Sequence, residues 1–172
     1  MKKMTISNAL MALFLLYSCS SEQSLVQPVK MDHLQNSGCK FALSAAESKP
    51  EFYVSEMEKT PKIEVRVDAK GIVSFNVVDL KENCAVEEIR PQVKTEENEM
   101  TIVLFPYSVD PSVEADCICS YDVSFQLVNL VGGQYYLRVY RSDGYGKYDA
   151  SKPAYEGKVI FSPNSSFETN LK

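Results

Sequence analysis

Two cysteines stand one residue apart in the stretch "ADCICSYD" at residues 115–122. Thiols this close in sequence can ligate a metal ion, carry redox chemistry or form disulfides that staple a fold. The chain offers Cys19, Cys39 and Cys84 as further sulfur donors. Which chemistry applies depends on the compartment of the protein and on the element that carries the pair.

The first 18 residues have the pattern of a secretory signal peptide. A short basic start is followed by "NALMALFLL", an apolar run too short to span a bilayer as a mature helix. The run ends in "LYSC", which resembles the bacterial lipobox, in which the cysteine becomes the acylated first residue after cleavage. The resemblance implies a signal peptide at 1–18 and a lipid anchor on Cys19, with palmitate among its acyl chains. The alternative is an ordinary signal peptide in which the cysteine is incidental. Ser20 follows in place of an aspartate, which implies the outer membrane.

One domain on a tether is expected after cleavage. Removal of residues 1–18 takes away two lysines and leaves 154 residues with 16 basic and 23 acidic side chains, a formal charge of −7. This length suits a single domain, and the acidic balance argues against a nucleic-acid partner. The stretch "SSEQSLVQPVK" predicts a flexible tether over 19–33 before a body at 34–172, with an edge strand at Leu25–Met31 as the alternative.

Alternating apolar and polar residues predict strands through most of the body. In "KIEVRVD", Ile63, Val65 and Val67 share one face, and "IVSFNVV" resumes the alternation after a turn at Gly71, so the two stretches predict a hairpin. A second hairpin is expected between "CAVEEIRPQVK" and "MTIVLFPY", where Pro91 predicts an edge position for the first member. The last clear strand is "GKVIFS". These patterns predict an all-β fold, an antiparallel β-sandwich of about seven or eight strands.

The paired cysteines fall on one of these strands. In "CICSYDVSFQLVNL", Cys117 and Cys119 share a face with the apolar Val123, Phe125 and Leu127, opposite polar residues from Ser120 to Gln126, so both cysteines are expected to face the core. Positions i and i+2 of a strand lie about 7 Å apart, at the limit for a disulfide, so each cysteine needs a distant partner. If Cys19 is acylated, four cysteines remain in a chain exported to an oxidising compartment, so two disulfides are expected. The pairing is either Cys39–Cys117 with Cys84–Cys119, or Cys39–Cys119 with Cys84–Cys117.

Metal and redox chemistry fit this pair less well. Zinc knuckles and thioredoxin-like sites use C-x-x-C, the latter at the start of a helix. No metal and no cofactor is therefore expected. Each of the two disulfides is expected to stabilise the fold by about 2–4 kcal/mol.

The sequence predicts no catalytic residue. The single histidine, His33, lies beside Asp32 at the end of the tether, where a solvated role suits it better than acid–base chemistry. The chain has no Gly-rich phosphate loop, no zinc-protease motif and no twelve-residue calcium loop. A carbohydrate-active hydrolase remains the enzymatic alternative, because paired carboxylates meet in space and 23 acidic residues are present.

One strand offers a candidate binding surface. "YYLRVYR" places Tyr136, Arg138 and Tyr140 on one face, and the following loop adds Tyr145 and Tyr148. Tyrosine and arginine are favoured at recognition surfaces, because they supply rigid contact area with polar tips. In the alternative interpretation, the tyrosines stack within the sheet or the loop covers them.

These motifs resemble known proteins in two respects. "LYSC", the cysteine at 84, the C-x-C strand and "GGQYYLRVY" are similar to small lipoproteins of Bacteroidetes envelopes, a group without an assigned function. The C-x-C strand, its glycine turn and the Tyr-rich strand also resemble the late hairpin of immunoglobulin-like or transthyretin-like sandwiches. That likeness implies pairing of the two strands, with these side chains inaccessible: Val123, Phe125, Leu137 and Val139.

The expected function is that of a non-catalytic binding or interaction module. Lipid holds it on the outer membrane, and the tyrosines contact a glycan or an envelope protein. Besides the hydrolase, the alternative is a structural accessory of a surface assembly that exchanges a strand, with the tether and the "SSFETNLK" tail as candidate segments.

Overall fold

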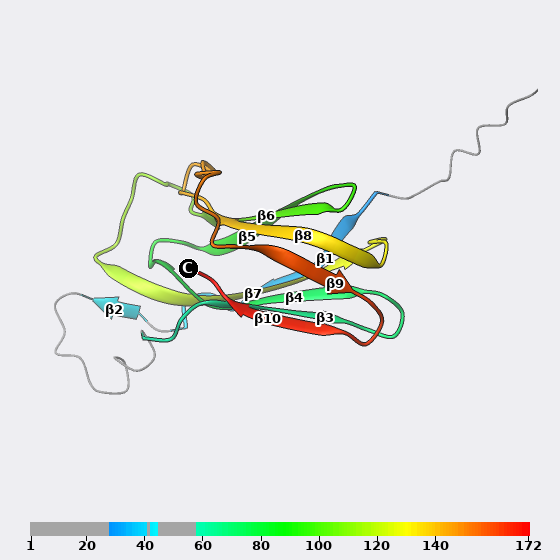
Figure 1. Ribbon diagram of the computed structural model, residues 1–172. Coiled ribbons are helices and arrows are strands. Elements are labelled where there is room, and N and C mark those ends of the chain that lie inside the picture. Colours follow the sequence, from blue (N-terminus) through cyan, green and yellow to red (C-terminus); the bar gives the residue numbers. More distant parts are fainter. Residues whose placement is uncertain (1–27, 41, 45–57) are drawn as a thin grey trace, which may run out of the picture.

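Two β-sheets pack face to face in the computed structural model, which describes residues 28–40, 42–44 and 58–172 (Figure 1). The regular elements of these residues are ten strands, where the sequence predicted about seven or eight. The expected all-β sandwich is confirmed. None of these segments forms a helix of the length and hydropathy needed to cross a bilayer.

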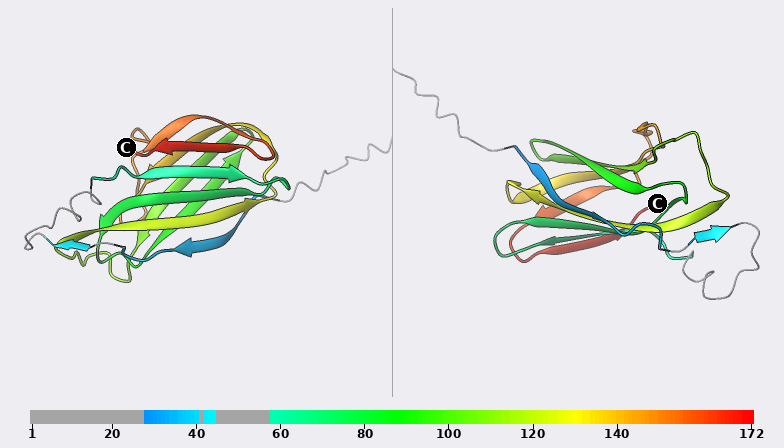
Figure 2. Two further views of the ribbon diagram at one scale, coloured as in Figure 1. Left: turned by 90° about the horizontal axis from the view of Figure 1, so that it is seen from below. Right: turned by 180° about the vertical axis from the view of Figure 1, so that it is seen from behind.

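The larger sheet has six strands, and each neighbouring pair is antiparallel. Figure 2 shows this sheet from below, with the strands side by side. Its order is β1 (Lys30–Asn36), β7 (Cys117–Val128), β4 (Val73–Asn83), β3 (Lys62–Val67) and β10 (Ser166–Asn170), while β2 (Ala42–Ser44) pairs with the start of β7.

The smaller sheet has four strands, one pair of which is parallel. Its order is β5 (Glu88–Glu96), β6 (Glu99–Tyr107), β8 (Gly133–Arg141) and β9 (Tyr155–Phe161). The other neighbouring pairs of this sheet are antiparallel, as predicted, whereas β6 and β8 are parallel. Between these strands the chain crosses into the larger sheet to form β7, and so it returns to the smaller sheet in the direction of β6.

Both predicted hairpins are confirmed. β3 pairs with β4 through a turn in which Gly71 has a φ of 84°, a conformation that glycine adopts without strain. β5 pairs with β6 along its whole length through a turn in which Glu97 has a φ of 51°. Pro91 lies on β5, an edge strand as expected, where its missing N–H costs no hydrogen bond within the sheet.

β7 and β8 do not form the expected hairpin. They belong to different sheets, and the chain crosses between them after Asn129, which has a φ of 64°. The burial expected from the pattern is nevertheless confirmed, because strands that pack face to face across a core show the same alternation as strands that pair. The exposed fractions are Val123 0%, Phe125 1%, Leu137 0% and Val139 0%.

Aromatic rings tie the two sheets together in the core. Phe75 of β4 stacks on Phe125 of β7 with ring centroids 5.0 Å apart. Phe161 of β9 meets Phe75 edge-on at 6.2 Å and contacts Tyr135 of β8 at 5.3 Å. Rings from both sheets therefore form one continuous contact that holds the sandwich closed.

A bulge in β4 sets which side chains of this strand face the core. The register with β7 shifts between Val77 and Leu80, where Asp79 has a φ of 59°. Strict alternation after Val77 would place Asp79 in the core. The bulge turns Leu80 inward instead, with 1% of its surface exposed, and leaves the Asp79 carboxylate outside the core.

The predicted tether and tail both take part in the larger sheet. β1 begins at Lys30, so the tether expected over 19–33 overlaps a strand that pairs with the end of β7, and the alternative of an early edge strand is nearer to the structure. The tail forms β10 on β3 and buries Leu171. The sequence did not predict β10, because its five residues carry no buried apolar side chain.

Candidate functional site

The four cysteines of the body form two disulfides at one end of the sandwich. Cys39 bonds to Cys119 and Cys84 bonds to Cys117, with 5.6 Å between the Cα atoms of each pair. The expected disulfides are confirmed, and the structure selects one of the two pairings that the sequence left open. Cys19, the predicted lipid anchor, lies outside the described residues.

The strand register explains this pairing. Asn83 pairs with Ile118, so the next residue, Cys84, lies opposite Cys117. The backbone N–H of Cys84 donates to the carbonyl of Cys117 at 3.2 Å. On the other side of β7, the N–H of Lys40 donates to Ser120 at 2.9 Å, which brings the preceding Cys39 beside Cys119.

The two cysteines of the C-x-C pair differ in burial. Cys119 is fully buried, as expected, whereas Cys117 is half-buried. Cys117 begins β7, which extends past the smaller sheet at this end (Figure 1). Cys84 is half-buried and Cys39 is exposed, so the cluster reaches from the core to solvent.

Hydrogen bonds from the chain around the cluster hold Cys84 in place. The side chain of Asn83 accepts from the N–H groups of Ala85 and Ala115 and donates to the carbonyl of Ala115 at 2.7 Å. The buried Tyr121 hydroxyl donates to Val86 at 2.9 Å, and burial raises the pKa of this phenol. The segments on both sides of the disulfide are thus tied to each other.

An ionic clasp joins the segment of Cys39 to the larger sheet. Nζ of Lys40 lies 2.8 Å from Oδ1 of Asp79 and 2.6 Å from Oδ1 of Asp122. Burial opposes the charge of Lys40, but hydrogen bonds to Asp122 and Asp79 outweigh it and raise its pKa. The sequence shows no sign of this clasp, because its members are distant in the chain and meet only through the bulge at Asp79.

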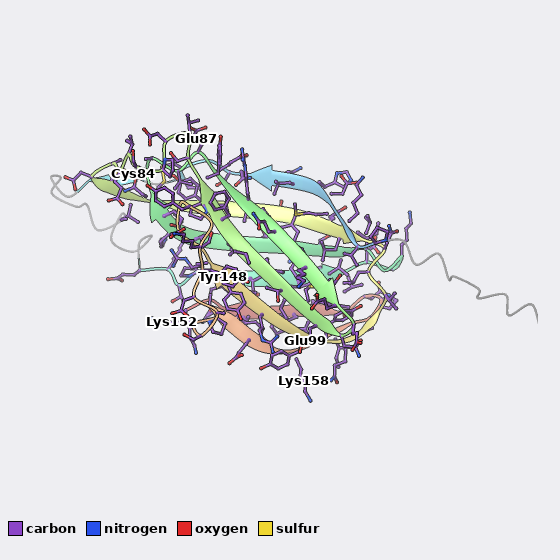
Figure 3. All side chains as sticks on the ribbon, turned by 90° about the horizontal axis from the view of Figure 1, so that it is seen from above. Cys84, Glu87, Glu99, Tyr148, Lys152 and Lys158 are labelled. Carbon is purple, nitrogen blue, oxygen red and sulfur yellow. A yellow bond between two sulfur atoms is a disulfide. The ribbon has the colours of Figure 1, made fainter. Side chains whose placement is uncertain are left out.

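The predicted tyrosine residues lie on the outer face of the smaller sheet, which Figure 3 shows from above with Tyr148 labelled. Tyr136, Arg138 and Tyr140 share this face of β8, as predicted. β6 and β5 add residues that the sequence analysis did not single out, although "TIVLFPY" alternates so as to place them there. We call the following set the tyrosine face: Arg90, Phe105, Tyr107, Tyr136, Arg138, Tyr140, Tyr145 and Tyr148.

The ring of Tyr148 lies on the ring of Tyr140, with centroids 4.7 Å apart. Tyr140 is only 6% exposed and donates its hydroxyl to the carbonyl of Ala150 at 3.4 Å, so it supports the face from below. The prediction that Tyr140 contacts a ligand is therefore replaced by the alternative in which the loop covers it. Tyr148 and Tyr145 are 44% and 64% exposed and form the outer surface.

Cations and rings pair across the rest of the face. The guanidinium carbon of Arg90 lies 3.3 Å from the centroid of Tyr107, and that of Arg138 lies 4.7 Å from the centroid of Tyr136. Phe105 meets Tyr107 edge-on at 6.5 Å. Such contacts hold side chains in fixed orientations, which lowers the entropy lost on binding a ligand.

The loop that carries Tyr145 and Tyr148 is held by its own carboxylates. Oδ1 of Asp143 accepts from the N–H groups of Tyr145 and Lys147 at 2.9 and 2.8 Å. Gly146 lies over Phe105 and has a φ of 77°, a backbone conformation in which a residue with a side chain would be strained. The exposed rings are therefore presented by a fixed loop.

Cations of the tyrosine face have acidic partners beside them. Arg138 lies 3.0 Å from Glu99, Arg90 lies 2.6 Å from Glu88, and an exposed pair joins Lys94 to Glu96. The hydroxyl of Tyr136 also donates to Glu156 at 3.4 Å. The face therefore offers rings and hydrogen-bonding groups with little excess charge.

Glu82 is the carboxyl with the most unusual environment in the described part of the chain. It crosses between the sheets to Arg141, with Oε1 2.7 Å from Nη2. Burial raises the pKa of Glu82, although the charge and hydrogen bond of Arg141 act in the opposite direction. Glu82 shares a cavity of about 170 Å³ with Glu114 and Asp143.

Two larger grooves open elsewhere on the sandwich. One of about 640 Å³ is lined by Arg141, Tyr155 and Lys172, and its one acidic lining residue is Glu156. The other, of about 580 Å³, lies between the β3–β4 turn and the β7–β8 crossing and has no acidic lining residue. Of these three cavities, only the smallest brings carboxylates together.

Comparison with protein-family models, with curated proteins and with solved structures found no match for this chain.

Proposed function

We propose that this protein is an exported lipoprotein, acylated at Cys19 and held on the outer membrane of a Bacteroidetes-type envelope, where it binds a ligand on the tyrosine face without catalysis. The observation that carries the proposal is the seating of Tyr148 on the buried Tyr140, on the outer face of the smaller sheet. A large exposed ring fixed from below supplies contact area at low entropic cost.

The ligand that suits this face best is a glycan. Pyranose rings have apolar faces, which stack on tyrosine, and hydroxyl groups, which bond to the carboxylates and cations beside the rings. Because the charges of Arg138 and Arg90 are already balanced by acidic partners, a neutral ligand suits this face better than a charged one. An envelope protein is the other candidate ligand.

The disulfides are consistent with export. Bonds of this kind form in oxidising compartments, among them the bacterial periplasm and cell surface. They agree with the signal sequence expected at 1–18 and support the export step of the proposal.

The direction of the chain suits an anchor at the N-terminus. β1 begins where Lys30 pairs with Val128, at the end of β7, whereas the disulfides lie at its start, about 35 Å away for a strand of this length. Because β1 belongs to the larger sheet and the tyrosine face to the smaller one, attachment ahead of β1 does not require the tyrosine face to meet the membrane.

The proposal is tested with the acylated protein in detergent, titrated with glycans that an array screen selects. Tyr148→Ala is expected to weaken binding at least about tenfold, because the loss of a central ring at a binding surface commonly exceeds about 1.4 kcal/mol. Val131→Ala is the control, since Val131 is 63% exposed and lies outside the tyrosine face. Equal affinity of both variants, or binding of no glycan but of an envelope protein alone, would contradict the glycan proposal.

A second candidate, a carbohydrate-active hydrolase, rests on the raised pKa of Glu82 and its shared cavity. A cavity of about 170 Å³ is smaller than the roughly 300–1,000 Å³ typical of ligand sites, and Arg141 already occupies one carboxylate oxygen of Glu82. Turnover of a glycan by the native protein that Glu82→Gln abolishes would favour this candidate over simple binding.

A further inference from the structure

The two disulfides are close enough to exchange partners. Sγ of Cys84 belongs to one disulfide, yet it lies within 4.8 Å of both sulfurs of the other, those of Cys39 and Cys119. Within the described residues this is the one group of three cysteine, histidine or acidic side chains with such close ligand atoms. A thiolate attacks a disulfide directly at sulfur, so proximity of this kind is the geometric requirement for exchange.

The cluster is also graded in its access to solvent. Cys84 and Cys117 are both half-buried, while Cys119 has none of its surface exposed. Exchange rates depend on the access of the attacking thiol. An external thiol can therefore reach the Cys84–Cys117 bond at either sulfur, but the Cys39–Cys119 bond only at the exposed Cys39, because Cys119 is buried.

We propose that the paired disulfides form a thiol–disulfide exchange site for an external dithiol, in which Cys84 relays the reaction to the Cys39–Cys119 bond. In the first step, a thiolate of the dithiol attacks Sγ of Cys117. This forms a mixed disulfide at Cys117 and releases Cys84 as a thiolate.

In the second step, the Cys84 thiolate attacks the Cys39–Cys119 bond. It forms a new disulfide with one of these sulfurs and releases the other as a thiolate, which takes a proton from water. The second thiol of the dithiol then resolves the mixed disulfide at Cys117. One dithiol is oxidised to a disulfide, and the protein exchanges two disulfides for one disulfide and two thiols.

The strand geometry makes Cys84 rather than Cys117 the relay. Cys117 and Cys119 are two positions apart on β7, where Cα atoms lie about 7 Å apart and side chains stand parallel. Cys84 directly follows the neighbouring strand β4, and its Sγ lies within 4.8 Å of both sulfurs of the second disulfide. Removal of either partner of the Cys84–Cys117 bond deletes the same disulfide but leaves a different thiol behind.

Two serine variants of the full chain use this asymmetry. Each is purified without reductant, trapped with an alkylating agent at low pH and mapped by mass spectrometry. In Cys117→Ser the free Cys84 is expected to form bridges to Cys39 or Cys119 in a fraction of the molecules, with loss of the native bridge. In Cys84→Ser the Cys39–Cys119 bridge is expected to stay intact, and Cys117 should be the one alkylated cysteine of the body.

An intact Cys39–Cys119 bridge in both variants would overturn the proposal, and exchange in both would show that loosening of the fold, rather than the position of Cys84, is the cause. The native protein supplies a measurement that does not depend on the folding of a variant. After treatment with less than one equivalent of dithiothreitol, singly bridged molecules should contain Cys84 bonded to Cys39 or Cys119. Recovery of the Cys39–Cys119 bridge alone would contradict the relay.

Discussion

Oδ1 of Asp79 lies 2.8 Å from Nζ of Lys40, a residue 39 positions earlier in the chain. Burial opposes the charge of Asp79, but the hydrogen bond and charge of Lys40 outweigh it and lower the pKa of the carboxyl below its ordinary value of 3.8. A carboxyl whose pKa is lower in the folded state stabilises the fold above the unfolded pKa, and this contribution is lost as the pH falls through the folded pKa.

We therefore expect Asp79→Asn to lower the free energy of unfolding by about 1–3 kcal/mol near neutral pH, as for the loss of a hydrogen bond to a charged group. The difference from the parent should shrink as the pH falls below 3.8. Asparagine tolerates the positive φ of this position, so the change tests the charge rather than the bulge. Urea unfolding across the pH range measures the effect.

Glu96→Gln is the matched control for the clasp. Glu96 pairs with Lys94, and both side chains are largely exposed, at 69% and 71%. Exposed pairs of this kind contribute little, so the free energy of unfolding should stay unchanged within error. An equal effect of the two substitutions would show that the clasp has no special role.

Removal of either disulfide should destabilise the body, and the longer loop should matter more. Replacement of both cysteines of a bridge by serine is expected to cost about 2–5 kcal/mol. The bridges close loops with sequence separations of 80 for Cys39–Cys119 and 33 for Cys84–Cys117. In the chain-entropy description, this difference makes the loss of the longer loop about 0.8 kcal/mol more costly.

Chemical denaturation of the two double-serine variants tests this order. Unchanged unfolding of the variant without Cys84 and Cys117 would show that this bridge does not stabilise the fold. Mass mapping of the unreduced native protein should find four oxidised cysteines in the body, and four alkylatable thiols with bound zinc would contradict the stapling role.

Cys19→Ala should release the protein from membranes. Without the thiol, no acyl chain can be attached, and the protein should accumulate either uncleaved or in the soluble fraction. Ser20→Ala is the control, because it leaves the thiol in place. Detergent-phase partitioning and intact mass measure the outcome, and unchanged partitioning of Cys19→Ala would show that Cys19 is not the anchor.

The two stacked tyrosines should differ in what their loss costs. Tyr140→Ala removes a ring that is 6% exposed and is expected to lower the free energy of unfolding by about 3 kcal/mol, as for other buried rings. Tyr148→Ala removes a ring that is 44% exposed and should cost less than about 1 kcal/mol. Thermal or urea unfolding distinguishes them, and equal losses would contradict the supporting role of Tyr140.

The alternation of apolar and polar residues could be read correctly from the sequence because it is a local property. Successive side chains of a strand point to opposite faces, so the inward positions of β3, β7 and β8 follow from the order of residues alone. The hairpins β3–β4 and β5–β6 could also be predicted, because their strands are joined by short turns with suitable residues at Gly71 and at residues 97–98.

Long-range relationships were decided only by the tertiary structure. β7 and β8 belong to opposite sheets and face each other across the core. Their alternation of buried and exposed residues would be the same if they were hydrogen-bonded neighbours in one sheet, so the sequence pattern could not distinguish the two arrangements. The choice of Cys84 as the partner of Cys117 depends on the register of β4 against β7, and that register includes a bulge at Asp79. Placement of Tyr148 over Tyr140 depends in turn on a loop that folds back over the sheet.

The sequence alone thus determined the all-β class, the inward faces, the tyrosine-rich strand and the use of the cysteines in pairs, because each is set by residue type and local spacing. The tertiary structure decided the sheet to which each strand belongs, the disulfide connectivity and the exposure of each tyrosine. The first two depend on contacts between residues tens of positions apart, whose loop-closure cost is balanced only when the whole core assembles, and the third depends on how the loop after β8 folds back over the sheet.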